Sequence, residues 1–133
     1  MSTRRLNIGI RSRAERESAL RTAVKRIRQG DLTPQETGLY FESVEELRRI
    51  LTDKRLDVLL AITRCHPGSV RALADLLGRN YKSVSADVDL LRQLGLVELE
   101  EQSGRRGVKV PVVPYDEIHV TITLRTASEV RAA

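Results

Sequence analysis

The sequence predicts a mainly α-helical domain with a small β-hairpin, preceded by a basic arm that contains one strand and one helix. Three observations support this fold class. Two helical patterns joined by a glycine turn occupy residues 69–94, two strand-like runs flank the Gly- and Arg-rich sequence at 103–107, and residues 4–10 alternate between polar and apolar. Apolar residues that recur every three or four positions indicate a helix, whereas strict alternation indicates a strand.

Residues 1–38 form the predicted arm. Leu6, Ile8 and Ile10 alternate with polar residues as in a short strand, and Ser12 precedes a segment with apolar residues at helical spacing. A single strand is not stable without a partner, so this strand is expected to pair with another one, for which the equivalent strand of a second subunit is a candidate. The glycines and the proline that follow the helix indicate a linker into the next element.

The formal net charge of +5 is concentrated in the arm. Residues 1–30 contain nine Lys and Arg residues against two Glu residues. A segment of this kind can bind nucleic-acid phosphates without sequence preference, with an affinity that falls as salt rises. The alternatives are a solvated helix face and a surface that binds an acidic partner protein.

Residues 39–125 form the predicted main domain, and residues 126–133 a flexible tail. Ser43 and Glu46 fit a capping box, in which each side chain accepts from a backbone N–H near the other, so a helix is expected to begin there. A second helix is expected to follow Thr52 and to end before the Pro-Gly pair at 67–68. These two helices are expected to pack beneath the next two.

Two further helices with a glycine turn between them occupy residues 69–94. Ser69 can cap the first helix, Gly78 can end it in the left-handed conformation, and Asn80 can cap the second. The second helix is expected to span about residues 81–94, with a buried apolar stripe on one side. Its first turn then remains exposed on the other side.

A strand is expected after Gly95, where the second helix ends. The sequence SGRRG at 103–107 then predicts a hairpin turn that carries Arg105 and Arg106 at its tip. A last strand is predicted within residues 118–124. Helix, turn, helix, strand, basic hairpin and strand in this order is the pattern of a winged helix-turn-helix.

This pattern predicts binding to double-stranded DNA, because the N-terminal part of the second helix enters the major groove in helix-turn-helix proteins. The predicted recognition residues are Arg79, Asn80, Tyr81, Lys82, Ser83 and Ser85. Among them, Arg79 is expected to contact phosphate. The residues expected to contact base edges are Asn80, Tyr81, Lys82 and Ser85. The predicted hairpin contacts are Arg105, Arg106 and Lys109. The alternative is that a helix pair and a Gly-rich turn of this kind also occur in folds that never touch nucleic acid.

Composition argues against other classes of function. The few aromatic residues offer no set of stacking platforms for single-stranded nucleic acid, which favours a duplex. Cys65 is the single cysteine, and His66 and His119 are far apart, so no metal site and no cofactor are predicted. Because the sequence contains no catalytic motif, no enzymatic activity is expected. It also contains no long apolar run, so we expect a cytoplasmic protein without membrane contact.

Three stretches of the sequence support a family resemblance. They are FESVEELRRILTDKRLDVLLAI, PGSVRALADLLGRNYKSVSADVDLLRQLGLVELE and PVVPYDEI, and they lie within residues 41–124. In these stretches the chain resembles the MarR-like winged-helix transcriptional regulators of prokaryotes, whose members often look like antitoxins of TumE-type toxin-antitoxin pairs. The resemblance implies a dimeric DNA-binding protein that represses its own operon, with a cognate toxin as a partner. The family's helix start falls on residues 79–82 and its Arg-rich hairpin on Arg105 and Arg106.

The sequence therefore predicts a sequence-specific DNA-binding transcriptional regulator, and the resemblance implies that it acts as an autorepressor and as the antitoxin of such a pair. The alternative is a protein-interaction module that neutralises a partner toxin through residues 1–38, with weak or absent DNA binding. In that case the winged domain would serve as a scaffold or a dimerisation module.

Overall fold

The computed structural model describes the chain except for residues 1–2, 32–37, 103, 105–106, 123 and 125–133. The chain forms two compact units. The first, here called the winged unit, consists of Met1–Arg4 and Leu51–Asp116, and the second, the sheet unit, consists of Arg5–Ile50 and Glu117–Ala133. No helix in the described part of the chain is long and apolar enough to cross a membrane.

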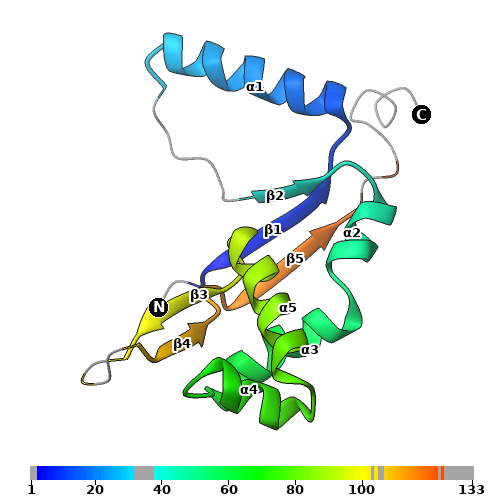
Figure 1. Ribbon diagram of the computed structural model, residues 1–133. Helices are drawn as coiled ribbons and strands as arrows, with labels where there is room; N and C mark the ends of the chain where they lie inside the picture. The colour runs from blue at the N-terminus through cyan, green and yellow to red at the C-terminus, as the bar shows by residue number, and fades with distance from the viewer. Residues whose placement is uncertain (1–2, 32–37, 103, 105–106, 123, 125–133) are drawn as a thin grey trace. The chain divides into compact units, whose positions relative to one another are not determined.

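A three-stranded parallel sheet forms the centre of the sheet unit (Figure 1). Strand β1 (Arg5–Ile10) lies between β2 (Gly38–Phe41) and β5 (Glu117–Thr121). The strand expected at residues 4–10 therefore does pair, and both of its partners belong to the same chain. Pairing with a second subunit is not needed to complete the ladder on either side of β1.

The two faces of this sheet differ in character. Paired residues of parallel strands lie on the same face, so the register assigns each side chain to one of them. One face carries the apolar residues Leu6, Ile8, Ile10, Leu39, Phe41, Ile118 and Val120. The other carries Asn7, Gly9, Gly38, Tyr40 and His119. Ile8 on the central strand is 1% exposed, which places the core of this unit on the apolar face.

Two helices complete the sheet unit. Helix α1 (Arg13–Arg28) connects β1 to β2, and its predicted cap is confirmed because the Ser12 hydroxyl accepts from the Glu15 backbone N–H. Helix α2 (Val44–Ile50) also begins as predicted. Ser43 accepts from the Glu46 N–H, but the Glu46 carboxylate accepts from the N–H of Glu42 and not from that of Ser43. The second half of the expected capping box is therefore shifted by one residue.

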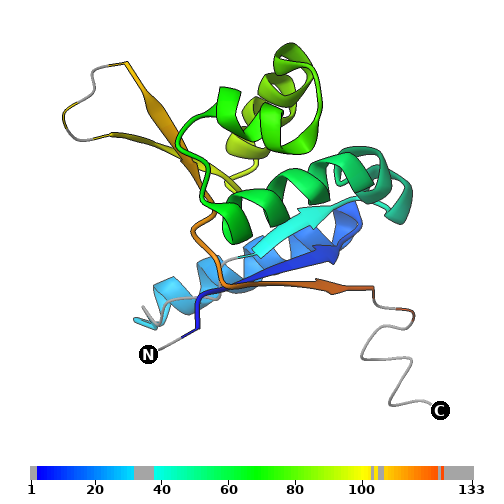
Figure 2. The same ribbon diagram turned by 90° about the horizontal axis from the view of Figure 1, so that it is seen from below.

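The winged unit contains three helices and a hairpin in its described part. The helices are α3 (Asp53–Cys65), α4 (Val70–Leu77) and α5 (Tyr81–Gln93), and the antiparallel hairpin pairs β3 (Glu98–Glu101) with β4 (Lys109–Val112). Figure 2 shows this hairpin extending from the helices of the unit. The predicted order of helix, turn, helix and hairpin is thus present. The core residues below 2% exposure are Val58, Leu73, Val84, Val88, Leu91, Leu96 and Val97.

The cap of α4 provides a test of the local structure. The Ser69 hydroxyl accepts from the Ala72 N–H at 3.0 Å, so Ser69→Ala leaves that donor without its partner. We expect a loss of about 1 kcal/mol in the free energy of unfolding, measured by chemical denaturation. Ser83→Ala is the matched control, because Ser83 is exposed within α5 and caps no helix. Equal stability of the two variants would contradict the capping role.

The fold class differs from the prediction in one respect. The predicted protein was mainly helical with a separate arm, whereas the structure is mixed α/β because β1 is the central strand of a parallel sheet. Residues 38–41 were not predicted as a strand, since four residues starting with glycine give too little alternation to recognise. The chain passes from one unit to the other after Arg4, after Ile50 and after Asp116.

Candidate nucleic-acid interface

The first turn of α5 is held in place by a short connection from α4. Gly78 ends α4 in the left-handed conformation, with φ 62°, which glycine adopts without a steric penalty. Asn80 then caps α5, because its side-chain oxygen accepts from the Lys82 N–H at 2.7 Å. The α4–turn–α5 segment is therefore fixed by hydrogen bonds that the sequence predicts.

The first turn of α5 presents polar side chains to solvent. Tyr81 is 41% exposed, and Lys82 and Ser83 are exposed as well. Val84 and Val88, which lie on the opposite side of the same helix, are at most 1% exposed. The helix thus faces the core with its valines, and Tyr81, Lys82 and Ser83 remain accessible at its start.

A groove runs between the start of α4, the exposed side of α5 and the β3–β4 hairpin. It has a volume of about 400 Å³ and is lined by the polar residues Ser69, Arg71, Tyr81, Ser85, Asp89 and Lys109, together with Val70, Val88, Leu99, Gly107 and Val108. Two cations and one carboxylate thus face the same concave surface. Lys109 reaches this surface from the hairpin, while the other two predicted hairpin contacts, Arg105 and Arg106, lie outside the described residues.

Arg71 is a groove residue that sequence reasoning missed. Its guanidinium lies over the ring of Tyr81, 4.5 Å from the ring centroid. This cation–π contact joins the first turn of α4 to the first turn of α5 and restrains an otherwise flexible side chain. The only sequence signal was an exposed arginine directly after a helix cap, which by itself does not distinguish a binding residue from a solvated one.

Arg79 does not occupy the position expected for a phosphate contact. Its Nη2 atom lies 2.8 Å from Oδ2 of Asp87, and the Nε atom of Arg55 lies 3.1 Å from Oδ1 of the same carboxylate. The Arg79 side chain is only 20% exposed, and Asp87 is buried. Arg79 therefore connects the turn to α5 and α3, through Asp87.

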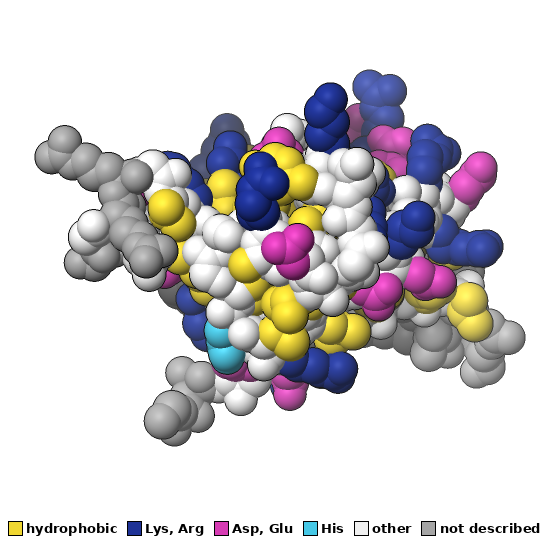
Figure 3. All heavy atoms as spheres, turned by 60° about the horizontal axis from the view of Figure 1, so that its bottom comes forward, with side chains coloured by type: hydrophobic (Ala, Val, Ile, Leu, Met, Phe, Trp, Pro, Cys, Tyr) yellow, Lys and Arg dark blue, Asp and Glu magenta, His cyan; other side chains and the backbone are white. Residues whose placement is uncertain are grey.

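Hydrophobic side chains are also exposed on the helices of the winged unit. Leu76 on α4 is 55% exposed, and Leu56 and Leu60 on α3 are 38% and 45% exposed. Figure 3 shows hydrophobic side chains between polar ones on the end of the molecule that carries α4. This apolar surface is made of different residues from those that line the groove.

The described residues contain no group of three or more His, Cys, Asp or Glu side chains that could hold a metal ion. Cys65 is exposed at the end of α3, and His66 ends that helix in the left-handed conformation, with φ 49°. Neither residue lines the groove. The chemistry of the groove therefore comes from its cations, hydroxyl groups and single carboxylate.

A family model and a solved structure are similar to parts of this chain. A family model described as HVO_A0114 matches residues 50–120. Among solved structures, the chain is similar to a MarR-like transcriptional regulator from Thermotoga maritima, with 22% identity and a TM-score of 0.44. The alignment covers 77% of this chain and 65% of that one, so this chain spans less than two thirds of its length. No protein with a curated description matches the sequence.

Proposed function

The chain belongs to the HVO_A0114 family, and from this premise and the geometry of the winged unit we propose that it is a transcriptional regulator that binds double-stranded DNA. The observation that carries the proposal is the groove in which the exposed start of α5 meets the β3–β4 hairpin. A helix preceded by a tight turn and flanked by such a hairpin has the shape that fits the major groove and its adjacent backbone.

Each part of the groove has a role in this proposal. The exposed start of α5 enters the major groove, where Tyr81, Lys82, Ser83 and Ser85 face base edges. Arg71 and Lys109 supply positive charge on either side of α5 and contact phosphates. Arg105 and Arg106 extend the hairpin contact, as the resemblance implies. Arg79 serves to position α5, because its guanidinium is already bound to Asp87.

The finer parts of the proposal rest on the family resemblance. We propose that the protein binds its own upstream region as a homodimer and represses transcription there. Two copies related by a twofold axis would place two α5 helices on one duplex, which is how dimeric helix-turn-helix proteins recognise palindromic sites. A cognate toxin of the TumE type is the proposed protein partner.

A second candidate function is binding of that partner by α1 in place of DNA binding. No residue of α1 is buried, and Leu20, Val24 and Ile27 are 65%, 40% and 61% exposed. An apolar stripe on a basic helix favours an acidic protein surface. Val24→Glu combined with Ile27→Glu should abolish capture of the neighbouring gene's product. Unchanged capture would exclude α1 as the contact.

The proposed DNA binding is tested with the full chain and a labelled duplex from its own upstream region. Fluorescence anisotropy should show tighter binding to this duplex than to a scrambled one, with an affinity that falls as salt rises. Equal, salt-sensitive binding to both duplexes would contradict sequence-specific recognition. Absence of binding at low salt would overturn the proposed function itself.

Lys82→Ala tests the role of α5 within this assay. Removing one phosphate or base contact should reduce the slope of log affinity against log salt by about 1, or reduce the preference for the specific duplex. Lys54→Ala is the matched control, because Lys54 is an exposed helical lysine of the same unit that belongs to α3 and not to α5. If the two variants behave alike, α5 does not contact DNA through Lys82.

A further inference from the structure

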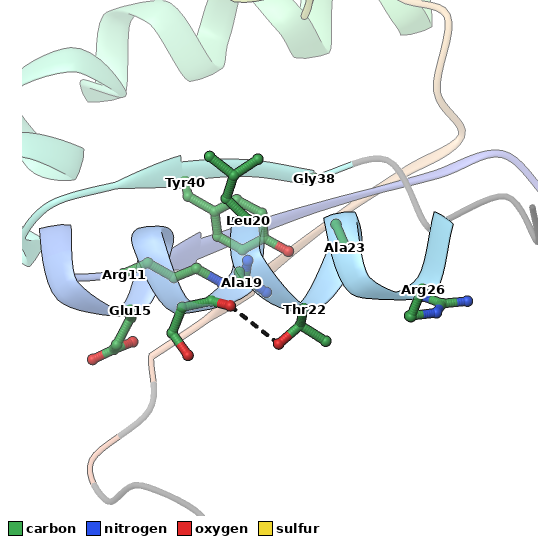
Figure 4. A pocket seen from close by; sticks show the side chains of 10 residues that line it. Arg11, Glu15, Ala19, Leu20, Thr22, Ala23, Arg26, Gly38 and Tyr40 are labelled. Atoms are coloured by element: carbon green, nitrogen blue, oxygen red, sulfur yellow. Dashed lines mark hydrogen bonds between the residues drawn. The ribbon is translucent and has the colours of Figure 1, made fainter. Parts of the chain in front are cut away.

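The sheet unit contains a cavity that the proposed DNA binding does not use. It lies between α1 and the sheet face that carries Tyr40, and its volume is about 680 Å³ (Figure 4). This is within the range of about 300–1,000 Å³ that is typical of small-molecule sites. The lining comes from one side of α1, from β2 and from Arg11 at the end of β1.

The floor of the cavity is a stacked pair of side chains. The guanidinium of Arg11 lies over the ring of Tyr40, 3.8 Å from the ring centroid. The Tyr40 ring packs against two glycines, and a side chain at either position would crowd it. A Cβ atom at Gly9 would lie 3.1 Å from the Tyr40 ring, and one at Gly38 would lie 2.7 Å from it. Glycine at these two positions leaves space for the Tyr40 ring, and the ring can therefore lie flat on the sheet beneath Arg11.

Arg11 is the cation of this cavity that lacks a carboxylate partner. Within the described residues, no ion pair joins it to an acidic side chain, although it is half-buried. Arg26, which also lines the cavity, is paired with Asp31 at 2.9 Å. The carboxylate of Glu15 points away from Tyr40 in Figure 4. An incompletely solvated guanidinium without a counter-charge attracts an anion.

The remaining residues that line the cavity indicate what kind of molecule fits beside Arg11. Ala19, Leu20 and Ala23 give the α1 side of the cavity an apolar wall. The Thr22 hydroxyl already donates to the Ser18 carbonyl oxygen at 3.1 Å, so it adds little polar recognition. We propose that this cavity binds a small organic carboxylate with an apolar body. Arg11 holds the carboxylate, and the apolar body lies against the wall of α1. The Glu15 carboxylate at the margin disfavours a second negative charge on the ligand.

The test uses the full chain without DNA, so its result is independent of the proposed regulatory function. Octanoate is the probe, 1-octanol is the neutral analogue, and inorganic phosphate is the anion without an apolar body. Binding is followed by NMR of ¹³C-labelled alanine methyl groups, because Ala19 and Ala23 report directly from the cavity wall. Octanoate should shift both signals saturably, octanol should bind about tenfold more weakly, and phosphate should leave them unchanged.

Variants of Arg11 and of the α1 wall test which residues bind octanoate. Arg11→Gln should weaken octanoate binding by about tenfold or more, because it removes the charge. Arg21→Gln is the matched control on the exposed side of α1 and should bind like the native chain. Ala23→Asp keeps Arg11 but places a negative charge on the apolar wall, where it repels the carboxylate of the ligand and interrupts the apolar surface, so it should abolish the octanoate shift of Ala19 even if Arg11→Gln fails to fold. Equal binding of octanol and octanoate, a shift by phosphate alone, or unchanged binding in Ala23→Asp would each overturn the proposal.

Discussion

Replacement of Asp87 with alanine should lower the free energy of unfolding of the winged unit by about 3 kcal/mol. The Asp87 carboxylate accepts from Arg55 of α3 and from Arg79 of the turn before α5, and its side chain is only 12% exposed. Its removal leaves two guanidinium groups close together without their shared counter-charge. Removing one partner of a buried ion pair costs more than the pair contributes, because the remaining charge stays poorly solvated.

Asp89→Ala is the matched control for this prediction. Asp89 lies two residues further along α5 and is exposed, so its removal should change stability by less than about 0.5 kcal/mol. Chemical denaturation followed by circular dichroism provides the comparison. A second variant, Asp87→Ala combined with Arg79→Met, also removes one of the two guanidinium charges. It should recover part of the lost free energy of unfolding. If Asp87→Ala is as stable as Asp89→Ala, the two arginines are solvated well enough to need no partner.

The same network should affect DNA binding without touching DNA. The buried Nη1 atom of Arg79 has no hydrogen-bond acceptor in the described structure. Within the described residues, Asp87 is the carboxylate that holds the Arg79 side chain in position. Without that contact, the turn at residues 78–80 loses its connection to α3 and to the second turn of α5. The proposed base contacts require α5 to be held in one orientation, because productive geometry tolerates only small displacements.

Local features of this fold were predictable from the sequence because they depend on few neighbouring residues. The hydroxyls of Ser12 and Ser69 each accept a hydrogen bond from the backbone three positions later, as the capping patterns predicted. The glycine at the end of α4 adopts the expected left-handed conformation. The order of helices and hairpin in the winged unit followed from the same short-range signals.

Features that depend on distant residues were not predictable in the same way. The alternation in residues 4–10 showed that a strand was present but not which strand would pair with it. One partner, β5, begins with Glu117, whose carboxylate is also bound by Arg5, 112 residues earlier. Likewise, Arg79 looked like a phosphate contact because its position beside the helix start was visible. Its contact with the buried Asp87 was established only by the folded structure.

Reversing the charges of Lys82 at the start of α5 and Lys109 on the hairpin should abolish most of the proposed DNA binding. Lys82 contributes to the exposed start of α5, and Lys109 lines the groove from the hairpin. In the double variant Lys82→Glu, Lys109→Glu, the proposed base-edge contact of Lys82 is lost, the proposed phosphate contact of Lys109 becomes repulsive, and fewer counterions are released on binding. We expect the affinity for the upstream duplex at low salt to fall by about 100-fold or more, measured by fluorescence anisotropy.

The control is a second double reversal that changes the net charge by the same amount. Lys54→Glu, Arg92→Glu alters exposed residues of α3 and of the last turn of α5 in the same unit, and neither residue lines the groove. Long-range attraction depends on the total charge and its distribution, so both variants lose some affinity. Only the groove variant loses direct contacts. If the two variants lose affinity equally, the protein attracts DNA through its overall charge, and the groove of α5 and the hairpin is not the surface that reads the duplex.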